Sequence, residues 1–156
     1  MSVNLEYKST HPMPMPEAVD YSLIGQIYRS HGNIQRLEAE IESSRRMLEL
    51  PDDWDGEGSP RYSERTFERA TAFVRNHVKW LWETFGITAP VPQINPGPAG
   101  SIDIHWKQRS WELLVNVPAE EGERATFYSD DYGTLVFKGH IDTTHPNFVG
   151  LLAWLT

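Results

Sequence analysis

The residues best suited to chemistry stand late in the chain, where two imidazoles and a carboxylate occur within six residues. His140, Asp142 and His145 are acceptable zinc or iron ligands by type. On a strand, His140 and Asp142 would share a face, because alternate side chains point the same way. His145 directly precedes a proline at a predicted helix start, and capping explains it equally well. This segment supports one alternative function, a small metal-dependent hydrolase or nuclease.

A second pair of chemically capable residues is Asp103 and His105. They would share a strand face and could meet Glu112 or Asn116 on the next strand, an arrangement suited to acid–base chemistry. The solvent-facing side of an amphipathic sheet has the same pattern and is commoner. The sequence holds neither a G-x-S-x-G elbow nor an S-x-x-K motif. We therefore assign no catalytic residue and expect no cofactor.

The segment 50–61 separates two helix-like stretches and holds two prolines and two glycines, which exclude a helix interior and require a shaped loop. We expect Trp54 to pack back into the core, since its apolar surface is large. Asp55, Gly56 and Gly58 complete this structural loop. Its acids also match several positions of a helix–loop–helix calcium site, but Pro60 and Arg61 depart from that pattern. The structural loop is the favoured interpretation.

Composition limits the function further. The chain has 156 residues, which fits one domain, and a net charge of −8, which argues against a broad electrostatic grip on nucleic acid. It has no cysteine, no secretory signal and no membrane-spanning apolar run, so we expect a cytoplasmic protein without a membrane partner. A second alternative is a nucleic-acid-binding accessory protein, acting only as part of a complex. Its candidate contacts are Arg36, Arg45 and Arg46, which acids surround in sequence.

Residues 1–19 are polar and proline-containing, and we expect a flexible arm there. Residues 20–49 have a helical apolar stripe that resembles a coiled-coil seam. Gly32-Asn33 predicts a break into two helices, with Asn33 capping the second. The stripe fits either self-association or packing on the domain's own core. Its interaction residues are Ile27, Ile34, Leu37, Ile41 and Leu48.

After the loop, a further helix is predicted over residues 62–86, and it would be the central helix of the fold. Ser63 is a good N-cap, and Gly86 fits the residue after the helix end. The apolar arc of this helix is wide, which predicts that it is covered on two sides. The proline-rich residues 87–100 predict an extended surface connector.

From residue 101 to 141 the apolar period changes to two, which predicts four short strands in an antiparallel meander. Residues 145–155 predict a short helix that follows the sheet. That helix is almost wholly apolar and must be buried against the sheet or a neighbouring subunit. Its interaction residues are Phe148, Leu151, Leu152 and Leu155.

The motif Leu50-Pro51-x-x-Trp54-Asp55-Gly56-x-Gly58-Ser59-Pro60, followed by Gly100-Ser101-Ile102-x-Ile104-x-Trp106, resembles a widespread group of small uncharacterised bacterial proteins. The resemblance covers roughly residues 48–118. It implies that the loop and the strand form one packed unit. The group has no established activity, so the resemblance transfers no catalytic residue.

The sequence therefore predicts an α+β fold over residues 20–156, with two N-terminal helices, a four-stranded antiparallel meander and a short C-terminal helix. The favoured function is a non-catalytic protein–protein interaction module, an accessory or regulatory subunit of a bacterial multi-protein complex. A toxin–antitoxin pair or a phage-defence assembly would be such a setting. We expect a protein partner or a homo-oligomer.

Overall fold

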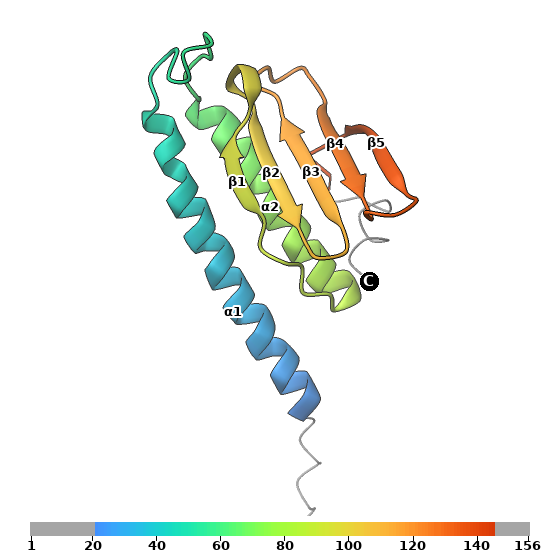
Figure 1. The fold of residues 1–156 in the computed structure, drawn as a ribbon. Helices are drawn as coiled ribbons and strands as arrows, with labels where there is room; N and C mark the ends of the chain where they lie inside the picture. The colour runs from blue at the N-terminus through green and yellow to red at the C-terminus, as the bar shows by residue number, and fades with distance from the viewer. Residues whose placement is uncertain (1–20, 146–156) are drawn as a thin grey trace, which may run out of the picture.

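The computed structural model describes residues 21–145 as an α+β fold, with two long helices and a five-stranded antiparallel sheet (Figure 1). Helix α2 lies against one face of the sheet, and α1 runs alongside it past strand β1 (Figure 1). The elements in chain order are α1 (Tyr21–Ser44), the 3-10 turn η1 (Arg45–Glu49), α2 (Glu64–Phe85), β1 (Gln93–Pro96), the 3-10 turn η2 (Pro98–Gly100), β2 (Ile102–Lys107), β3 (Glu112–Val117), β4 (Ala125–Asp130) and β5 (Val136–Ile141).

The sheet is a meander in which each strand pairs with the next, in the order β1-β2-β3-β4-β5. The predicted four strands are present as β2 to β5. The prediction missed β1, which lies inside the supposed connector and pairs Ile94 with Ile104 of β2. Pro96 ends β1, and an edge strand tolerates proline because only one side needs backbone donors.

Helix α1 is continuous from Tyr21 to Ser44, so the predicted break at Gly32-Asn33 is wrong. A helix-interior glycine costs only about 1 kcal/mol relative to alanine, and long helices tolerate that cost. Asn33 does not cap a helix. Its side-chain amide instead donates to the carbonyl of Ala89 at 2.5 Å, which ties α1 to the segment after α2.

Helix α2 begins and ends as its sequence predicts. The Ser63 hydroxyl accepts the backbone N–H of Thr66 at 3.1 Å, and Gly86 ends the helix in the left-handed conformation at φ 66°. One face of α2 packs beneath β2 and β3, and another meets α1. The expectation that α2 is covered on two sides is therefore confirmed.

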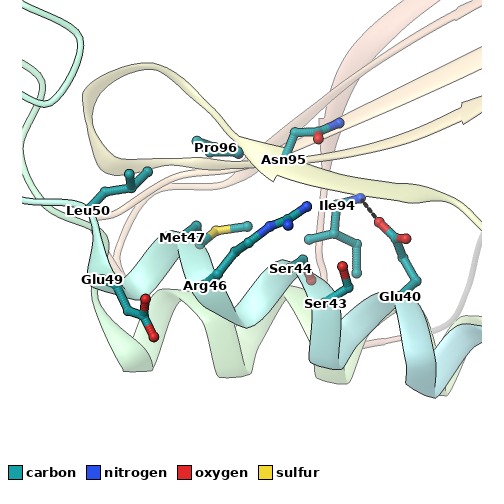
Figure 2. A pocket seen from close by; sticks show the side chains of 10 residues that line it. All are labelled: Glu40, Ser43, Ser44, Arg46, Met47, Glu49, Leu50, Ile94, Asn95 and Pro96. Atoms are coloured by element: carbon teal, nitrogen blue, oxygen red, sulfur yellow. Dashed lines mark hydrogen bonds between the residues drawn. The ribbon is translucent and has the colours of Figure 1, made fainter.

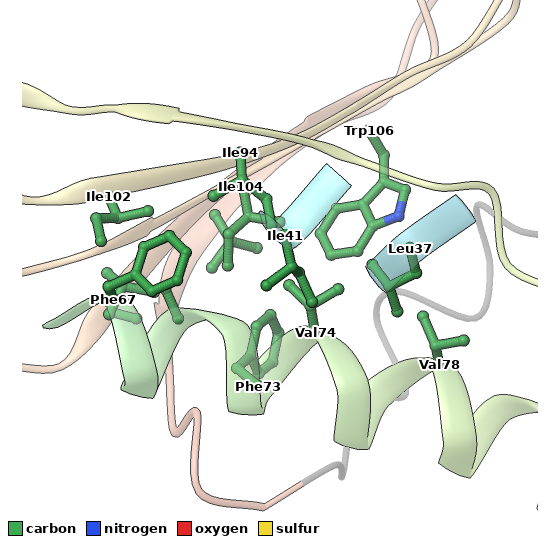
Figure 3. Close-up of a cluster of buried hydrophobic side chains, with 14 of the residues drawn as sticks. Leu37, Ile41, Phe67, Phe73, Val74, Val78, Ile94, Ile102, Ile104 and Trp106 are labelled. Atoms are coloured by element: carbon green, nitrogen blue, oxygen red, sulfur yellow. The ribbon is translucent and has the colours of Figure 1, made fainter. Parts of the chain in front are cut away.

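The core lies between α2, α1 and the inner face of the sheet (Figure 3). Alternate residues of β2 supply Ile102, Ile104 and Trp106, all of which are buried. They meet buried side chains from both helices, among them Leu37, Ile41, Phe67, Phe73, Val74 and Val78. The alternation of β2 predicts this inner face correctly.

His77 of α2 is also part of the buried interior. Its ring stacks on Phe73 at 5.7 Å between centroids and meets Trp106 edge-on at 6.2 Å. Burial lowers the pKa of His77 from 6.5 to about 4, because the interior disfavours the charged imidazolium. His77 is thus a neutral core residue at physiological pH.

Two predicted segments lie outside the described residues. They are the arm over residues 1–19 and, apart from His145, the C-terminal helix over 145–155 with Phe148, Leu151, Leu152 and Leu155. In the part of the chain that is described, no helix combines the length and apolar character needed to cross a bilayer.

Candidate interaction surface

The apolar stripe of α1 divides into two parts with different surroundings. Leu37 and Ile41 are buried in the core, and Leu48 of η1 packs against it. Ile27 and Ile34 are 51% and 46% exposed. The interpretation that the stripe packs on the domain's own core is therefore confirmed for one part of it only. Its C-terminal part packs on the domain, and its N-terminal part faces outward.

The exposed part continues toward the start of α1. Leu23 and Ile24 are 52% and 37% exposed and lie on the same stripe as Ile27. We call these three residues the ridge. In Figure 1 the first turns of α1, drawn in blue, extend beyond the end of α2 and away from the sheet. Such an apolar and exposed helix face is typical of an interaction site.

A groove adjoins the ridge. It has a volume of about 340 Å³ and lies between α1 and the C-terminal half of α2. Ser30, Ile34 and Leu37 line it from α1, and Val78, Trp82 and Ile87 line it from the other side. The sequence shows Trp82 on α2, but only the crossing of the two helices brings it beside Ile34.

Charged side chains at the rim of the groove form opposite-charge pairs. The Arg75 guanidinium donates to both carboxylate oxygens of Glu38, at 2.7 Å each. This hydrogen bonding lowers the pKa of Glu38 and raises that of Arg75. Lys79 and Glu83 lie 3.8 Å apart one turn along α2. The rim therefore has little net charge, and the groove favours an apolar, uncharged occupant.

The loop at residues 50–61 is shaped by its own acids. The Asp55 carboxylate accepts the Ser59 hydroxyl at 2.5 Å and the backbone N–H of Glu57 at 3.0 Å. Asp53 accepts the backbone N–H of Gly58 at 2.7 Å. Gly56 and Gly58 take positive φ angles of 73° and 84°, which glycine adopts without strain. These carboxylates serve the loop's own amides, which supports the structural interpretation over calcium binding.

Trp54 does not pack into the core as predicted. It is 40% exposed and lies against Tyr62, with ring centroids 6.3 Å apart. The local hydrogen bonds of Asp53 and Asp55 fix the loop without a buried anchor. Tyr62 is the buried aromatic residue here, and its hydroxyl donates to the carbonyl of Gly97 at 2.6 Å.

The end of the loop contacts the turn that precedes β2. A Cβ added at Gly100 would lie 3.3 Å from Pro60 and 3.8 Å from the carbonyl of Arg61. Gly100 also has a φ of 78°, so both backbone angle and space favour glycine. The loop and the Gly100–Trp106 segment are thus in direct contact.

On the outer face of the sheet, Asp103 and His105 meet Asn116 and Glu112 of the next strand, as the alternation of β2 predicts. The Asn116 amide donates to the Asp103 carboxylate at 2.7 Å, and His105 Nε2 lies 2.9 Å from the Glu112 carboxylate. Asp103 and His105 thus each bond to a residue of the neighbouring strand and not to one another. Such cross-strand pairs stabilise a sheet.

The candidate metal ligands divide between β5 and the turn that follows it. Asp142 and His145 pair at 3.0 Å, and the Thr144 hydroxyl and backbone N–H both donate to Asp142. These bonds, with those of Thr144 first, lower the pKa of Asp142 to about 2. His140 lies on β5 opposite Thr126. Within residues 21–145, no group of three or more metal-binding side chains is placed to hold an ion.

The three candidate arginines have separate surroundings. Arg45 donates to Glu64 at 2.5 Å and lies over the Phe67 ring at 5.1 Å. Arg46 lines an open pocket of about 540 Å³ between η1 and β1, which it shares with Glu40 and Glu49 (Figure 2). Arg36 lines a different hollow, beside Arg29. Acids accompany two of the three, so a phosphate backbone would meet mixed charge.

Comparison of the chain with protein-family models, with curated proteins and with solved structures gives no match. The geometry of the ridge and the groove is therefore the basis for a functional conclusion.

Proposed function

We propose that this chain is a non-catalytic protein–protein interaction module, an accessory or regulatory subunit of a multi-protein complex. The observation that carries the proposal is the apolar stripe of α1, which continues past the end of α2 and stays exposed at Ile24 and Ile27. Burying such surface against another protein is favourable by about 25 cal/mol per Å² of apolar area. A face of this kind is therefore a binding face.

The resemblance of the loop and the β2 strand to small bacterial proteins favours a bacterial complex, such as a toxin–antitoxin pair or a phage-defence assembly. The absence of cysteine from the sequence is in keeping with a reducing, cytoplasmic setting. The partner is a protein, either a different chain or another copy. Nucleic acid would enter only through such a complex.

The test is the mass of the native complex and its dependence on Ile27. The full chain, tagged and expressed at its native level, is isolated gently from its own cells as wild type, as Ile27→Glu and as Gln35→Glu. Gln35 is an exposed residue elsewhere on α1 and provides the matched control. We expect wild type and Gln35→Glu to migrate above the mass of one tagged chain, which is 17.9 kDa plus the tag, and Ile27→Glu to lose this association.

Two outcomes would contradict the proposal. One is a wild-type chain that runs at the mass of one tagged chain, 17.9 kDa plus the tag, both in the cell extract and after purification. The other is a complex that Ile27→Glu leaves unchanged, because the ridge would then not be the binding face.

A further inference from the structure

Strands β4 and β5 lie partly beyond the cover that the two helices give the sheet. Helix α2 packs beneath β2 and β3, and β4 and β5 lie on the side of it away from α1 (Figure 1). On the inner face of these strands, Ser129 and Ile141 are nevertheless only 1% and 4% exposed. Phe137 lies directly opposite Ser129 on the same face and is 48% exposed. A buried isoleucine at the end of the outermost strand, together with an exposed phenylalanine, indicates a further apolar cover over this face.

We call the inner-face residues of the two strands the β4–β5 face; they are Ala125, Phe127, Ser129, Phe137 and Ile141. We propose that this face is the docking site of the chain's own residues 146–156, which lie outside the described residues. The inference goes beyond the proposed function, because it concerns an intramolecular contact on a surface other than the ridge. It chooses the sheet over a neighbouring subunit, the two places that the sequence leaves open for this segment.

The chain leaves β5 at one end of the β4–β5 face. Ile141 is the last residue of β5. The Asp142 carboxylate then accepts the backbone N–H of Thr144 at 2.9 Å and lies 3.0 Å from His145 Nδ1, which holds residues 142–145 in a turn. Such a turn directs the following residues back along the hairpin. Four residues reach at most about 14 Å, which is enough to pass from a strand to a packed layer about 10 Å away.

The composition of the segment matches this face and not the opposite one. Residues 146–156 contain no charged side chain, and their apolar residues recur at helical spacing. Four of the five residues of the β4–β5 face are apolar, and the fifth is Ser129. The opposite face of β5 carries Lys138 and His140, whose polar groups would lose water beneath an apolar cover. The inner face is therefore the favourable side for this segment.

The length of the segment also fits. A helix from Asn147 to Leu155 would be about 14 Å long at 1.5 Å per residue. The strand from Ile141 back to Phe137 covers about 14 Å at 3.4 Å per residue. A helix that begins beside Ile141 and runs antiparallel to β5 therefore ends beside Phe137, with Leu155 as the neighbour of Phe137.

The covalent connection selects this occupant over a separate chain. A short linker gives a tethered segment an effective concentration in the millimolar range. A second copy or another protein at micromolar concentration would therefore be outcompeted by about 1,000-fold for the same contacts.

The experiment is thiol reactivity in the full chain, which contains no cysteine of its own. Ser129→Cys reports on the β4–β5 face, and Val115→Cys, at a fully buried core position of β3, is the matched control. We expect both thiols to react slowly. Adding Leu151→Glu/Leu152→Glu should speed the reaction at Ser129→Cys by roughly 10-fold or more, because buried carboxylates are costly and the segment would leave the face. The same pair of charges should leave the rate at Val115→Cys unchanged.

The second measurement is disulfide trapping. Phe137→Cys/Leu155→Cys should close a disulfide within one chain under mild oxidation, so that the mass stays near 17.9 kDa, because the two Cα atoms would lie within about 7 Å. Lys138→Cys/Leu155→Cys is the control, since Lys138 lies on the opposite face of β5 and should cross-link far more slowly.

An unchanged rate at Ser129→Cys in the charged variant would overturn the inference. If both thiols react faster together, the charged variant has unfolded as a whole, and the cross-link then decides alone. Equal cross-linking from Phe137→Cys and Lys138→Cys would overturn the docking on the inner face. Covalent dimers in place of closed single chains would overturn the intramolecular contact and assign the segment to a second copy. None of these readouts involves Ile27, so the proposed function is tested separately.

Discussion

The carboxylate of Glu40 on α1 accepts the backbone N–H of Ile94 on β1 at 3.0 Å. A helix side chain here takes the place of the next strand, since the outward N–H of an edge strand needs an acceptor. Figure 2 shows this bond beside the pocket that η1 and β1 form. Ile94 itself is buried in the core, so the bond fixes the edge of the sheet against α1.

Glu40→Ala should therefore destabilise the fold by about 1–3 kcal/mol, the cost of leaving a part-buried donor unsatisfied. Glu40→Gln keeps an oxygen acceptor and should cost less. Urea denaturation of the two variants measures the difference. Equal losses of unfolding free energy in Glu40→Ala and Glu40→Gln would show that a side-chain oxygen acceptor at this position does not stabilise the fold.

His77 predicts a specific dependence of stability on pH. Its folded pKa is about 4, and its ordinary value is 6.5. Between these values the unfolded chain binds a proton that the folded chain does not, so the free energy of unfolding falls as the pH falls from about 6.5 to 4. The loss is of order 3 kcal/mol at most.

His77→Phe removes the titrating group and keeps an aromatic ring, so its stability should change less over this pH range. His105→Phe is a matched substitution at a half-buried histidine on the outer face of the sheet. The comparison uses urea denaturation at several pH values. A His77→Phe curve that falls as steeply as that of the wild type would rule out His77 as the source.

Gly100 and Gly122 provide a matched pair of glycine substitutions. Gly100→Ala combines a φ of 78° with a Cβ that would lie 3.3 Å from Pro60, and it should cost about 1–2 kcal/mol. Gly122 has open space around an added Cβ, so Gly122→Ala should change stability by less than about 0.5 kcal/mol. Thermal unfolding of both variants makes the comparison. Similar losses at the two positions would contradict the tight contact at Gly100.

Periodicity predicts α2 and strands β2 to β5 because each element contains its own signal. Ser63 and Gly86 fix the ends of α2 through bonds within a few residues. Strand β1 has no such local signal. It forms by pairing with β2, and its outer edge bonds to Glu40, which lies 54 residues away in sequence. Its prolines favour an extended connector equally well.

The exposure of the α1 stripe was predicted only in part, for a similar reason. The period of seven in α1 identifies Ile27 and Ile34 correctly as members of one stripe. The sequence of α1 does not show where along this helix α2 ends. Leu37 is buried and Ile27 is exposed because α2 packs beside the first residue and ends before the second. This arrangement arises from the packing of two segments that are distant in sequence.

Trp54 is the residue whose environment the sequence predicts wrongly, and its exposure gives a direct test. It is 40% exposed and contacts the Tyr62 ring, so Trp54→Ala should cost only about 1 kcal/mol. Phe67→Ala, at a fully buried position of α2, should cost about 3–5 kcal/mol. Urea denaturation of both variants ranks the two losses. A loss at Trp54 equal to that at Phe67 would mean that the tryptophan anchors the loop in the core, whereas a small loss means that the carboxylates of Asp53 and Asp55 hold the loop in shape.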